Sequence, residues 1–380
     1  MKLQELTIEE QRDIAHKLLN KKYGGMKETQ EKLCEKYGVN IATLYRWAKV
    51  LKRDNVIDFE TNSFIKSRST MVDADGNVKL QWVKEDREVT DRLNDIREAV
   101  DTIMSGVKAI EEVPVVEAIR STDMFNLYIN SDLHIGALMD ESETGDRDWD
   151  RKIALKTIKA SIDFLLDASP NTEVGVVVDL GDILEIDDFK NATPKSGNKL
   201  DVDGRYSKIL DVALEATEYM VQKALVKHKT VYFININGNH DITSGHSIRA
   251  YMRGRFKDNS RVIVDESHKE IKYFEFGSTL LGFAHGDGLR MRDAGEVMVV
   301  DNEATFSGTA NRYFHFGHVH KDSVYDGRLC RSESHRNLSP LNNWAAHMGY
   351  RRQAGTMKCI TYHAEFGEIN RTTFNVNMVK

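Results

Sequence analysis

Beyond Pro114, the hydrophobic pattern alternates between short apolar runs and longer amphipathic stretches. The apolar runs 125–130, 174–179 and 231–236 are typical of buried strands. The stretches 149–168, 206–229 and 247–257 have apolar residues at helical spacing. From residue 261 onward strands dominate, with runs at 262–264, 271–276, 279–284, 313–317 and 357–363. Alternating strand–helix units followed by a strand-rich half predict a layered α/β domain.

The first third of the chain has a different pattern. Residues 7–52 show apolar positions at three- and four-residue spacing, which predicts helices. Residues 71–82 alternate around an Asp-Gly pair and predict a hairpin. Residues 86–112 predict a charged helix whose apolar stripe is long enough for a short coiled coil, and so for a homodimer seam or a connecting helix. We expect three parts: a helical module at 1–55, a linker at 56–120 and the α/β domain at 121–380.

Charge separates the head of the chain from its body. Residues 1–53 contain 12 Lys and Arg against 7 Asp and Glu, a net charge of +5. The whole chain carries −6, so the remainder carries −11. A basic head on an acidic body fits a polyanion-binding module joined to an enzyme, although a merely solvated helical surface would look the same.

Composition predicts an ordinary intracellular globular protein. No apolar run approaches the ~20 residues that span a bilayer, so no membrane association is expected. The three cysteines, Cys34, Cys330 and Cys359, are too widely spaced to suggest a disulfide framework or a thiolate metal site. We therefore expect a cytoplasmic location.

Five polar clusters follow the apolar runs, and each lies where a predicted strand ends. Because strand ends at one edge of a sheet converge, residues far apart in sequence can form one pocket. Asp, His and Asn side chains supply the oxygen and nitrogen ligands that suit Mn, Fe, Zn or Mg. Two ions about 3.5–4 Å apart need a bridging carboxylate, for which Asp182 is the natural candidate. The clusters are Asp132-Leu-His134, Gly181-Asp182, Gly238-Asn-His-Asp241, His285-Gly-Asp287 and Gly317-His-Val-His320.

Each cluster taken singly has an ordinary structural explanation. A Gly-Asp pair is commonly a turn, a lone histidine such as His285 is commonly buried and hydrogen-bonded, and His318 and His320 would also suit a strand with two outward histidines. The ordered combination of five clusters at five strand ends favours a binuclear metal site.

These motifs resemble those of the calcineurin-like metallophosphoesterases, whose signature is D-x-H, G-D, G-N-H-D/E, a lone His and G-H-x-H. The resemblance covers roughly residues 125–320 and implies a four-layer α-β-β-α sandwich that holds two divalent ions, with Mn expected and Mg, Fe or Zn as alternatives. It also implies a metal-bridging hydroxide as nucleophile, with His240 as general acid and Asp241 orienting it. The implied ligands are Asp132, His134, Asp182 and His320 for one ion, and Asp182, Asn239, His285 and His318 for the other.

The residues that flank these motifs indicate which branch of the family the chain resembles most. The Arg-containing extensions of the protein Ser/Thr phosphatases are absent around Gly181-Asp182 and His240. Lipid-precursor pyrophosphatases usually have Arg where this chain has His240. The string Ser131-Asp-Leu-His-Ile-Gly136 is similar to the DNA repair exonuclease branch and to the archaeal polymerase small subunit.

Residues 30–51 resemble a helix-turn-helix, with Leu33, Tyr37 and Trp47 among its packing positions and Gly38 at the turn. In that motif the second helix reads the major groove. The resemblance implies DNA contacts by Asn40, Thr43, Arg46 and Lys49. A helical module for docking or assembly is the alternative.

The sequence thus predicts a metal-dependent phosphoesterase, most simply a DNA nuclease or phosphodiesterase with DNA as its partner. One alternative is a small-molecule phosphatase or nucleotide phosphodiesterase whose head serves assembly. Another is a non-enzymatic DNA-binding or scaffold protein, against which the intact set of ligand residues argues.

Overall fold

The computed structural model describes residues 33–37, 39, 43, 47, 65–72, 78–85, 107–110, 113–114, 120–194, 197–349, 351 and 354–379. The chain divides into two compact units, Met1–Asp91 and Arg92–Lys380. The finer three-part division expected from the sequence stays a prediction.

The first unit contains a short helical stretch and a hairpin. Residues 33–37 are helical, and Leu33, Tyr37 and Trp47 are buried, as expected of packing positions. The predicted hairpin is confirmed with longer arms, since β1 (Ile65–Val72) pairs antiparallel with β2 (Val78–Glu85). Of the predicted DNA contacts, Asn40, Arg46 and Lys49 lie outside the described residues, and Thr43 is helical and half-buried. The helix-turn-helix therefore stays a prediction.

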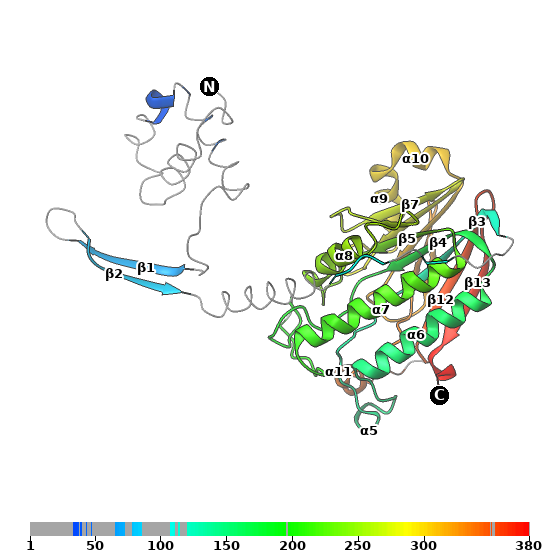
Figure 1. The fold of residues 1–380 in the computed structure, drawn as a ribbon, viewed down its shortest axis with the longest axis horizontal. Helices are drawn as coiled ribbons and strands as arrows, with labels where there is room; N and C mark the ends of the chain where they lie inside the picture. The colour runs from blue at the N-terminus through cyan, green and yellow to red at the C-terminus, as the bar shows by residue number, and fades with distance from the viewer. Residues whose placement is uncertain are drawn as a thin grey trace. The chain divides into compact units, whose positions relative to one another are not determined.

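A six-stranded sheet forms the centre of the second unit (Figure 1). Strands β3 to β6 run parallel, while β12 is antiparallel to both of its neighbours, β3 and β13. The apolar runs predicted as buried strands lie here. In spatial order the strands are β13 (Gly367–Asn375), β12 (Thr356–His363), β3 (Ser121–Asn130), β4 (Thr172–Asp179), β5 (Thr230–Asn235) and β6 (Val262–Val264).

The second sheet has five strands. β8 and β9 pair in parallel, as do β9 and β11, and the two edge strands are antiparallel to their neighbours. Its spatial order is β10 (Ser323–Asp326), β11 (Arg331–Ser334), β9 (Asn311–Phe316), β8 (Thr279–Ala284) and β7 (Lys272–Phe276).

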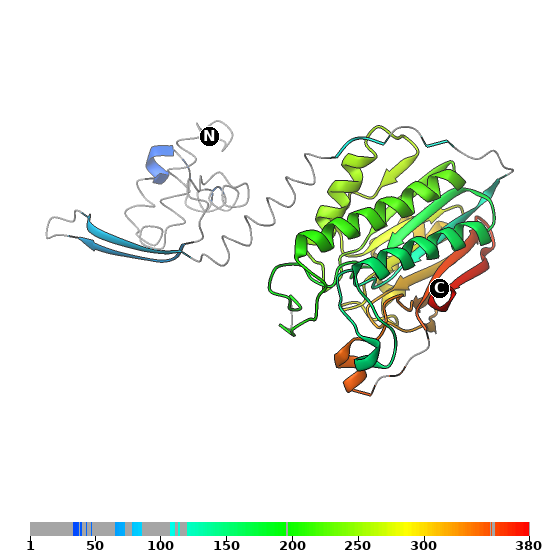
Figure 2. The same ribbon diagram turned by 60° about the horizontal axis from the view of Figure 1, so that its bottom comes forward.

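Helices cover the outer faces of both sheets. The long α6 and α7 run side by side over the six-stranded sheet (Figures 1 and 2). Asp150 begins α6 by accepting hydrogen bonds from the N–H groups of Lys152 and Ile153, which would otherwise lack partners. The helices are α5 (Glu141–Thr144), α6 (Arg151–Ala168), α7 (Tyr206–Lys227), α8 (Ser244–Arg255), α9 (Ala294–Asp301), α10 (Glu303–Gly308), α11 (Asn343–His347) and the 3-10 turn η2 (Val376–Met378).

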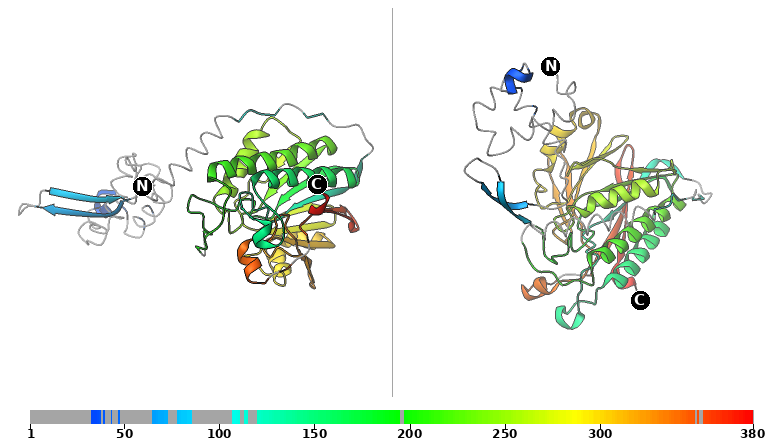
Figure 3. Two further views of the ribbon diagram at one scale, coloured as in Figure 1. Left: turned by 90° about the horizontal axis from the view of Figure 1, so that it is seen from below. Right: turned by 60° about the vertical axis from the view of Figure 1, so that its left-hand side comes forward.

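Three apolar clusters lie between the four layers of helices and sheets. One, with Ile158 and Leu210, lies between α6, α7 and the six-stranded sheet. Another, with Leu127 and Phe283, fills the space between the sheets. A third, with Met298, joins α9 to the outer face of the second sheet. Figure 3 shows the green helices on one side of the strands and the yellow and orange segments on the other. The predicted α-β-β-α layering is therefore confirmed.

The predicted helix 86–112 is wrong at its end, and its remainder lies outside the described residues. Residues 107–110 are not helical. Ile110 donates its backbone N–H to the carbonyl of Arg255, and the Arg255 side chain donates to the carbonyl of Lys108. These contacts with the end of α8 replace the hydrogen bonds that a continuing helix would make. The expected homodimer seam stays a prediction.

The cysteines and the hydropathy of the helices bear on the expected cellular location. All three cysteines are free. Among the described helices, none combines the length and apolar character needed to cross a bilayer. The cytoplasmic location itself stays a prediction.

Candidate metal centre

The five predicted clusters meet at one edge of the two sheets. Asp132 and His134 follow β3, Asp182 follows β4, and Asn239 and His240 follow β5. From the second sheet, His285 follows β8, and His318 and His320 follow β9. Because β3, β4 and β5 run parallel, and β8 and β9 do as well, their carboxyl ends lie together. The structure thus brings together all the residues predicted as metal ligands.

The backbone at this edge is strained. Asp132, His134, Asp182, His318 and His320 all have φ between 46° and 65°, in the left-handed region. Non-glycine residues rarely occupy that region, and each such residue costs about 1–3 kcal/mol. Apart from these five, Asn191 is the only described non-glycine residue with positive φ. Such strain gathers where a particular side-chain direction is needed, which supports a functional site.

One group of ligands consists of Asp132, His134 and His320. Their ligand atoms all lie within 4.8 Å of one another. The Nε2 atoms of His134 and His320 are 3.1 Å apart, and His320 Nε2 is 3.1 Å from the Asp132 carboxylate. The Asp132 carboxylate also accepts the N–H of His318 and the hydroxyl of Ser131, so it is held firmly in place.

The second group consists of Asp182, His285 and His318, again within 4.8 Å of one another. His285 Nε2 lies 3.2 Å from the Asp182 carboxylate and 3.0 Å from the Oδ1 of Asn239. The first group contains three of the four ligands predicted for one ion, and the second group with Asn239 contains all four predicted for the other, while their binding of metal stays a prediction. The assignment of Asp182 as a bridge stays a prediction.

The hydrogen bonds of His285 show that this arrangement suits a cation. Its Nδ1 donates to the carbonyl oxygen of Leu180 at 2.8 Å, because a carbonyl can only accept. A neutral ring then turns the lone pair of Nε2 toward Asn239 Oδ1 and the Asp182 carboxylate, which also only accept. Three acceptors that face one another repel unless positive charge lies among them. A proton on Nε2 or a divalent cation meets that requirement, so the residues fit the predicted metal.

The pKa values of His285 and His134 also show that positive charge is favoured at this site. Burial opposes charge on His285, but the Asp182 carboxylate outweighs it and raises the pKa of His285 to about 10. Burial likewise opposes charge on His134, but Glu185 raises the pKa of His134 to about 9. Burial also opposes ionisation of Asp182, yet neighbouring histidines, His285 foremost, hold its pKa below the usual range. The field at His285 and His134 therefore favours positive charge, whereas burial and the charge of His285 lower the pKa of His318.

Glu185 is a site residue that the sequence analysis missed. Its buried carboxylate lies 2.7 Å from His134 Nδ1 and 3.8 Å from His240 Nδ1. A carboxylate on the far nitrogen of a ligand histidine fixes the ring and its tautomer. The available signal was an acidic residue in the otherwise apolar run that follows Asp182.

His240 stands beside the ligands. Its ring centroid is 4.9 Å from that of His134, and its Nδ1 donates to the carbonyl oxygen of Glu185 at 2.8 Å. Nε2 is therefore the atom of His240 that can gain or lose a proton. The His240 backbone N–H donates to the Asp182 carboxylate at 2.7 Å, which ties this loop to the metal ligands.

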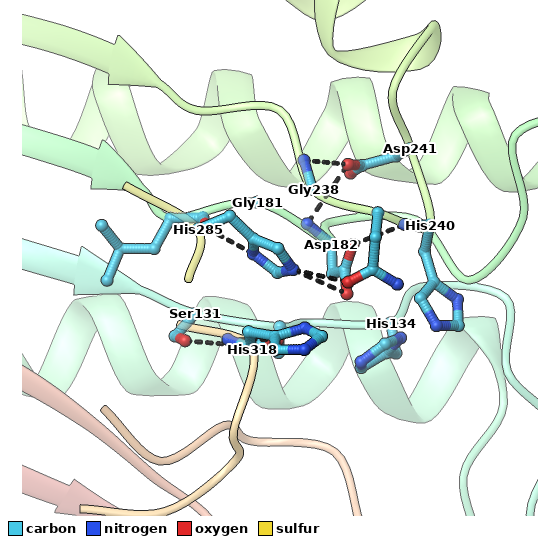
Figure 4. A network of polar contacts seen from close by, with 12 residues as sticks. Ser131, His134, Gly181, Asp182, Gly238, His240, Asp241, His285 and His318 are labelled. Carbon is cyan, nitrogen blue, oxygen red and sulfur yellow. Dashed lines mark hydrogen bonds and ion pairs between the residues drawn. The ribbon is translucent and has the colours of Figure 1, made fainter. Parts of the chain in front are cut away.

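The predicted role of Asp241 needs correction. Its buried carboxylate accepts backbone N–H groups from Gly238, Asp182, Ile183 and Leu184, at 2.7–3.2 Å. Figure 4 shows Asp241 against the backbone of Gly238 and Asp182, while the His240 ring lies near His134. Asp241 thus holds two loops together and does not orient His240. The Asp241 carboxylate binds backbone N–H groups, and the His240 imidazole is hydrogen-bonded to the Glu185 carbonyl instead.

A cavity of about 570 Å³ opens over the centre. Asp182, Asn239, His240, His318 and His320 line it, so the ligands and the predicted acid face the same space. Its remaining walls come from the segment after β3, from Glu185, from Thr193 and residues 198–201, and from the start of α11.

A second histidine–carboxylate cluster lies between the sheets. His315, Glu333 and His335 also have ligand atoms within 4.8 Å of one another, and all three are buried. Tyr362 Oη and His335 Nε2 lie 3.0 and 2.9 Å from the two nitrogens of the His315 ring. Glu333 pairs with both ends of the Arg371 guanidinium, which shows that its charge is already compensated.

Comparisons with known proteins give only remote likenesses. No protein-family model and no curated protein matches the chain. Among solved structures, an archaeal phosphodiesterase is 14% identical, with 66% of this chain and 99% of that chain covered and a TM-score of 0.35. A phosphoesterase from E. coli, Yfce, is 10% identical, with 66% and 100% covered and a TM-score of 0.30.

A predicted phosphoesterase from Streptococcus pneumoniae is 11% identical, with 68% of this chain and 92% of that chain covered and a TM-score of 0.30. At such low identities and TM-scores, the function of this chain has to be argued from its own site.

Proposed function

We propose that the body of this protein hydrolyses phosphate esters with two divalent cations, and that its substrate is a phosphodiester of DNA. The observation that carries the proposal is the convergence of seven candidate ligand residues at strand ends below an open cavity, five of them with a left-handed backbone and several with acceptor atoms that face one another. Such an arrangement costs free energy in a chain that binds no cation.

The two described groups would hold the two cations. Asp132, His134 and His320 would hold one, and Asp182, His285 and His318 with Asn239 the other. When bound, the cations would supply an activated water and stabilise the charge that develops on the phosphoryl oxygens.

His240 would handle the proton of the leaving group. Its Nδ1–H is held by the Glu185 carbonyl, so the ring is oriented before substrate arrives. A protonated Nε2 can then donate to the leaving oxygen, which otherwise departs as a costly alkoxide. The side chain of His240 is 14% exposed and lines the cavity, so a substrate can reach it.

The choice of DNA is supported by the head of the chain. Residues 1–53 carry +5, and a basic module attracts a polyanion irrespective of its sequence. The second candidate is a nucleotide phosphodiesterase or small-molecule phosphatase. The low positive charge of the cavity favours this second candidate, because Lys199 is the one lysine or arginine among the described lining residues.

The two candidates are separated by assaying the full chain with Mn²⁺ on single-stranded DNA, double-stranded DNA and bis-4-nitrophenyl phosphate. Cleavage of DNA that is lost in an identically purified Asp182→Ala variant supports the proposal. Turnover of the small ester without any DNA cleavage would reject DNA and leave the second candidate. Zero bound metal per chain together with no turnover would reject the phosphoesterase itself.

A further inference from the structure

We propose that the mouth of the metal cavity binds one unpaired nucleotide, whose base stacks on Trp344. The inference rests on the proposed phosphoesterase function and specifies its substrate: a phosphodiester attached to a nucleoside that is not base-paired.

Trp344 lies where such a base would have to be. It belongs to α11, and it lines the same cavity as the metal ligands and His240. The residue is 63% exposed, and its indole ring offers a large apolar surface to the cavity. Leu138, 49% exposed, lines the cavity too. Single exposed apolar residues are ordinary on protein surfaces, but two on the rim of a metal cavity provide a site for a flat apolar group.

The segment that carries Trp344 is anchored. The side chain of Asn342 accepts the N–H of Ala345 at 2.8 Å and so caps α11. Leu341 donates its N–H to Asp146 at 3.1 Å, and Asn343 donates its side-chain amide to Glu143 at 2.8 Å. A platform held by the segment around α5 loses little entropy when a base stacks on it.

Asn343 offers a polar contact beside this platform. Because its Nδ2 donates to the Glu143 carboxylate, its Oδ1 is the remaining acceptor. That oxygen is buried and has no hydrogen-bond partner among the described residues, and Asn343 lines the cavity. A buried acceptor without a partner is costly, and an N–H group on the edge of a base, such as the ring N–H of thymine, would satisfy it.

Charge limits the length of nucleic acid that the cavity engages. Among the described lining residues, Lys199 is accompanied by the acidic Asp201 and Glu185. Tracking a long phosphate backbone takes several cations, whereas one cation beside a metal centre suits a single nucleotide unit. Stacking on Trp344 also requires a base whose face is not covered by its neighbours, as in an unpaired end or a free nucleotide.

Two esters with the same leaving group test the stacking. Thymidine 5′-(4-nitrophenyl) phosphate has a base, and methyl 4-nitrophenyl phosphate has none. Stacking contributes about 5–150-fold per base. Trp344→Ala should lower kcat/KM by that factor for the thymidine ester and change it less than about 2-fold for the methyl ester, while Trp344→Phe keeps most of the activity. Equal losses on both esters, or a loss on neither, would overturn the proposal.

Phe366→Ala is the matched control. Phe366 is 64% exposed, almost the same as Trp344, and it lies in the β12–β13 turn, where it stacks on His363 and not at the cavity. The variant should treat both esters like the wild type. If it reproduced the Trp344→Ala result, the effect would belong to exposed aromatic residues in general and the proposal would fall.

Fluorescence tests the same contact without turnover, so failure of the proposed chemistry leaves this inference testable. With Mn²⁺, thymidine 5′-phosphate and a short single-stranded oligothymidylate should both quench tryptophan emission in the full chain, and Trp344→Phe should abolish the change. Quenching by the oligonucleotide alone assigns the site to strand ends, and quenching by both admits free nucleotides. No quenching by either, or equal quenching by a blunt duplex, would overturn the proposal.

Discussion

The candidate metal centre and the His315–Glu333–His335 cluster both bring histidines and a carboxylate together with ligand atoms within 4.8 Å of one another, but their surroundings differ. In the metal centre, carboxylates raise the pKa of His285 to about 10 despite its burial. In the cluster between the sheets, burial dominates and lowers the pKa of His315 to about 4. Lys358 and Arg371 already neutralise Glu333 there, at the closed interior of the sandwich.

This contrast teaches that residue type and proximity do not make a metal site. A cation site needs uncompensated acceptors and access from solvent. The strand ends supply both, because parallel strands leave their polar side chains at an open edge below a cavity. The interior cluster instead uses a chain of hydrogen bonds from Tyr362 through His315 to His335, in which at least one of the two rings is neutral because one nitrogen of the His315–His335 pair has to accept.

The sharpest test of the contrast is Asp182→Ala. Metal content should fall from two ions per chain, because the charge of Asp182 acts on both His285 and His134. The loss of turnover should exceed the about 10²–10⁴-fold that removal of one acid–base group costs. Elemental analysis and ester hydrolysis measure the two effects. Retention of both ions would contradict the assignment of Asp182 as a bridge.

His240→Gln separates chemistry from metal binding within the same centre. We expect kcat to fall about 10²–10⁴-fold while both ions remain, because in the proposed mechanism His240 donates a proton and is not a ligand. The loss should be smaller for 4-nitrophenyl esters, whose leaving group needs no proton. A variant that loses its metal would show that His240 belongs to the ligand set.

Glu333→Ala perturbs the interior cluster. It leaves Lys358 and Arg371 without their shared carboxylate, and breaking a buried ion pair costs about 3 kcal/mol of unfolding free energy. Denaturant titration gives that loss, and metal content per folded chain should stay at two. A fall in metal content would mean that this cluster binds a cation after all.

Stability should depend on pH through His315. Its folded pKa of about 4 lies below the value of 6.5 for the exposed ring, so the unfolded chain binds more protons between these limits. Stability is therefore lost as pH falls below 6.5, by about 2 kcal/mol at pH 5. The groups facing the ring are Tyr362, His335, Glu333, Lys358 and Arg371.

Unfolding free energies at pH 7.5 and pH 5 should differ less in His315→Gln than in the wild type, because the variant lacks the titrating ring. The same dependence in both proteins would assign the pH effect to other groups.

Glu185→Gln should have the smallest effect. The substitution keeps the shape of the side chain but removes the charge that pairs with His134. Loss of such a contact to a ligand histidine lowers metal affinity at least about 10-fold. Metal titration against a chelator measures the change. Unaltered affinity would show that Glu185 serves packing alone.

Most of the body was predictable from local pattern. The buried strands β3, β4, β5 and β8 lie within one or two residues of the expected runs, except that β3 begins four residues earlier. The missed elements, such as β10, β13 and α10, are short or half exposed, so their apolar periodicity is weak. The convergence of the candidate ligand residues could be predicted because each lies near a strand end, where polar residues interrupt an apolar run.

The chain's own order of residues determined which side chains could serve a metal centre, because each motif is local to one strand end. Only the tertiary structure decided what each side chain does there. It turned the carboxylate of Asp241 onto four backbone N–H groups, set Glu185 behind His134, and put Trp344 on the rim of the cavity. These partners come from segments that are distant in sequence. Which neighbour a polar group finds therefore depends on how the layers pack, and no local pattern encodes it.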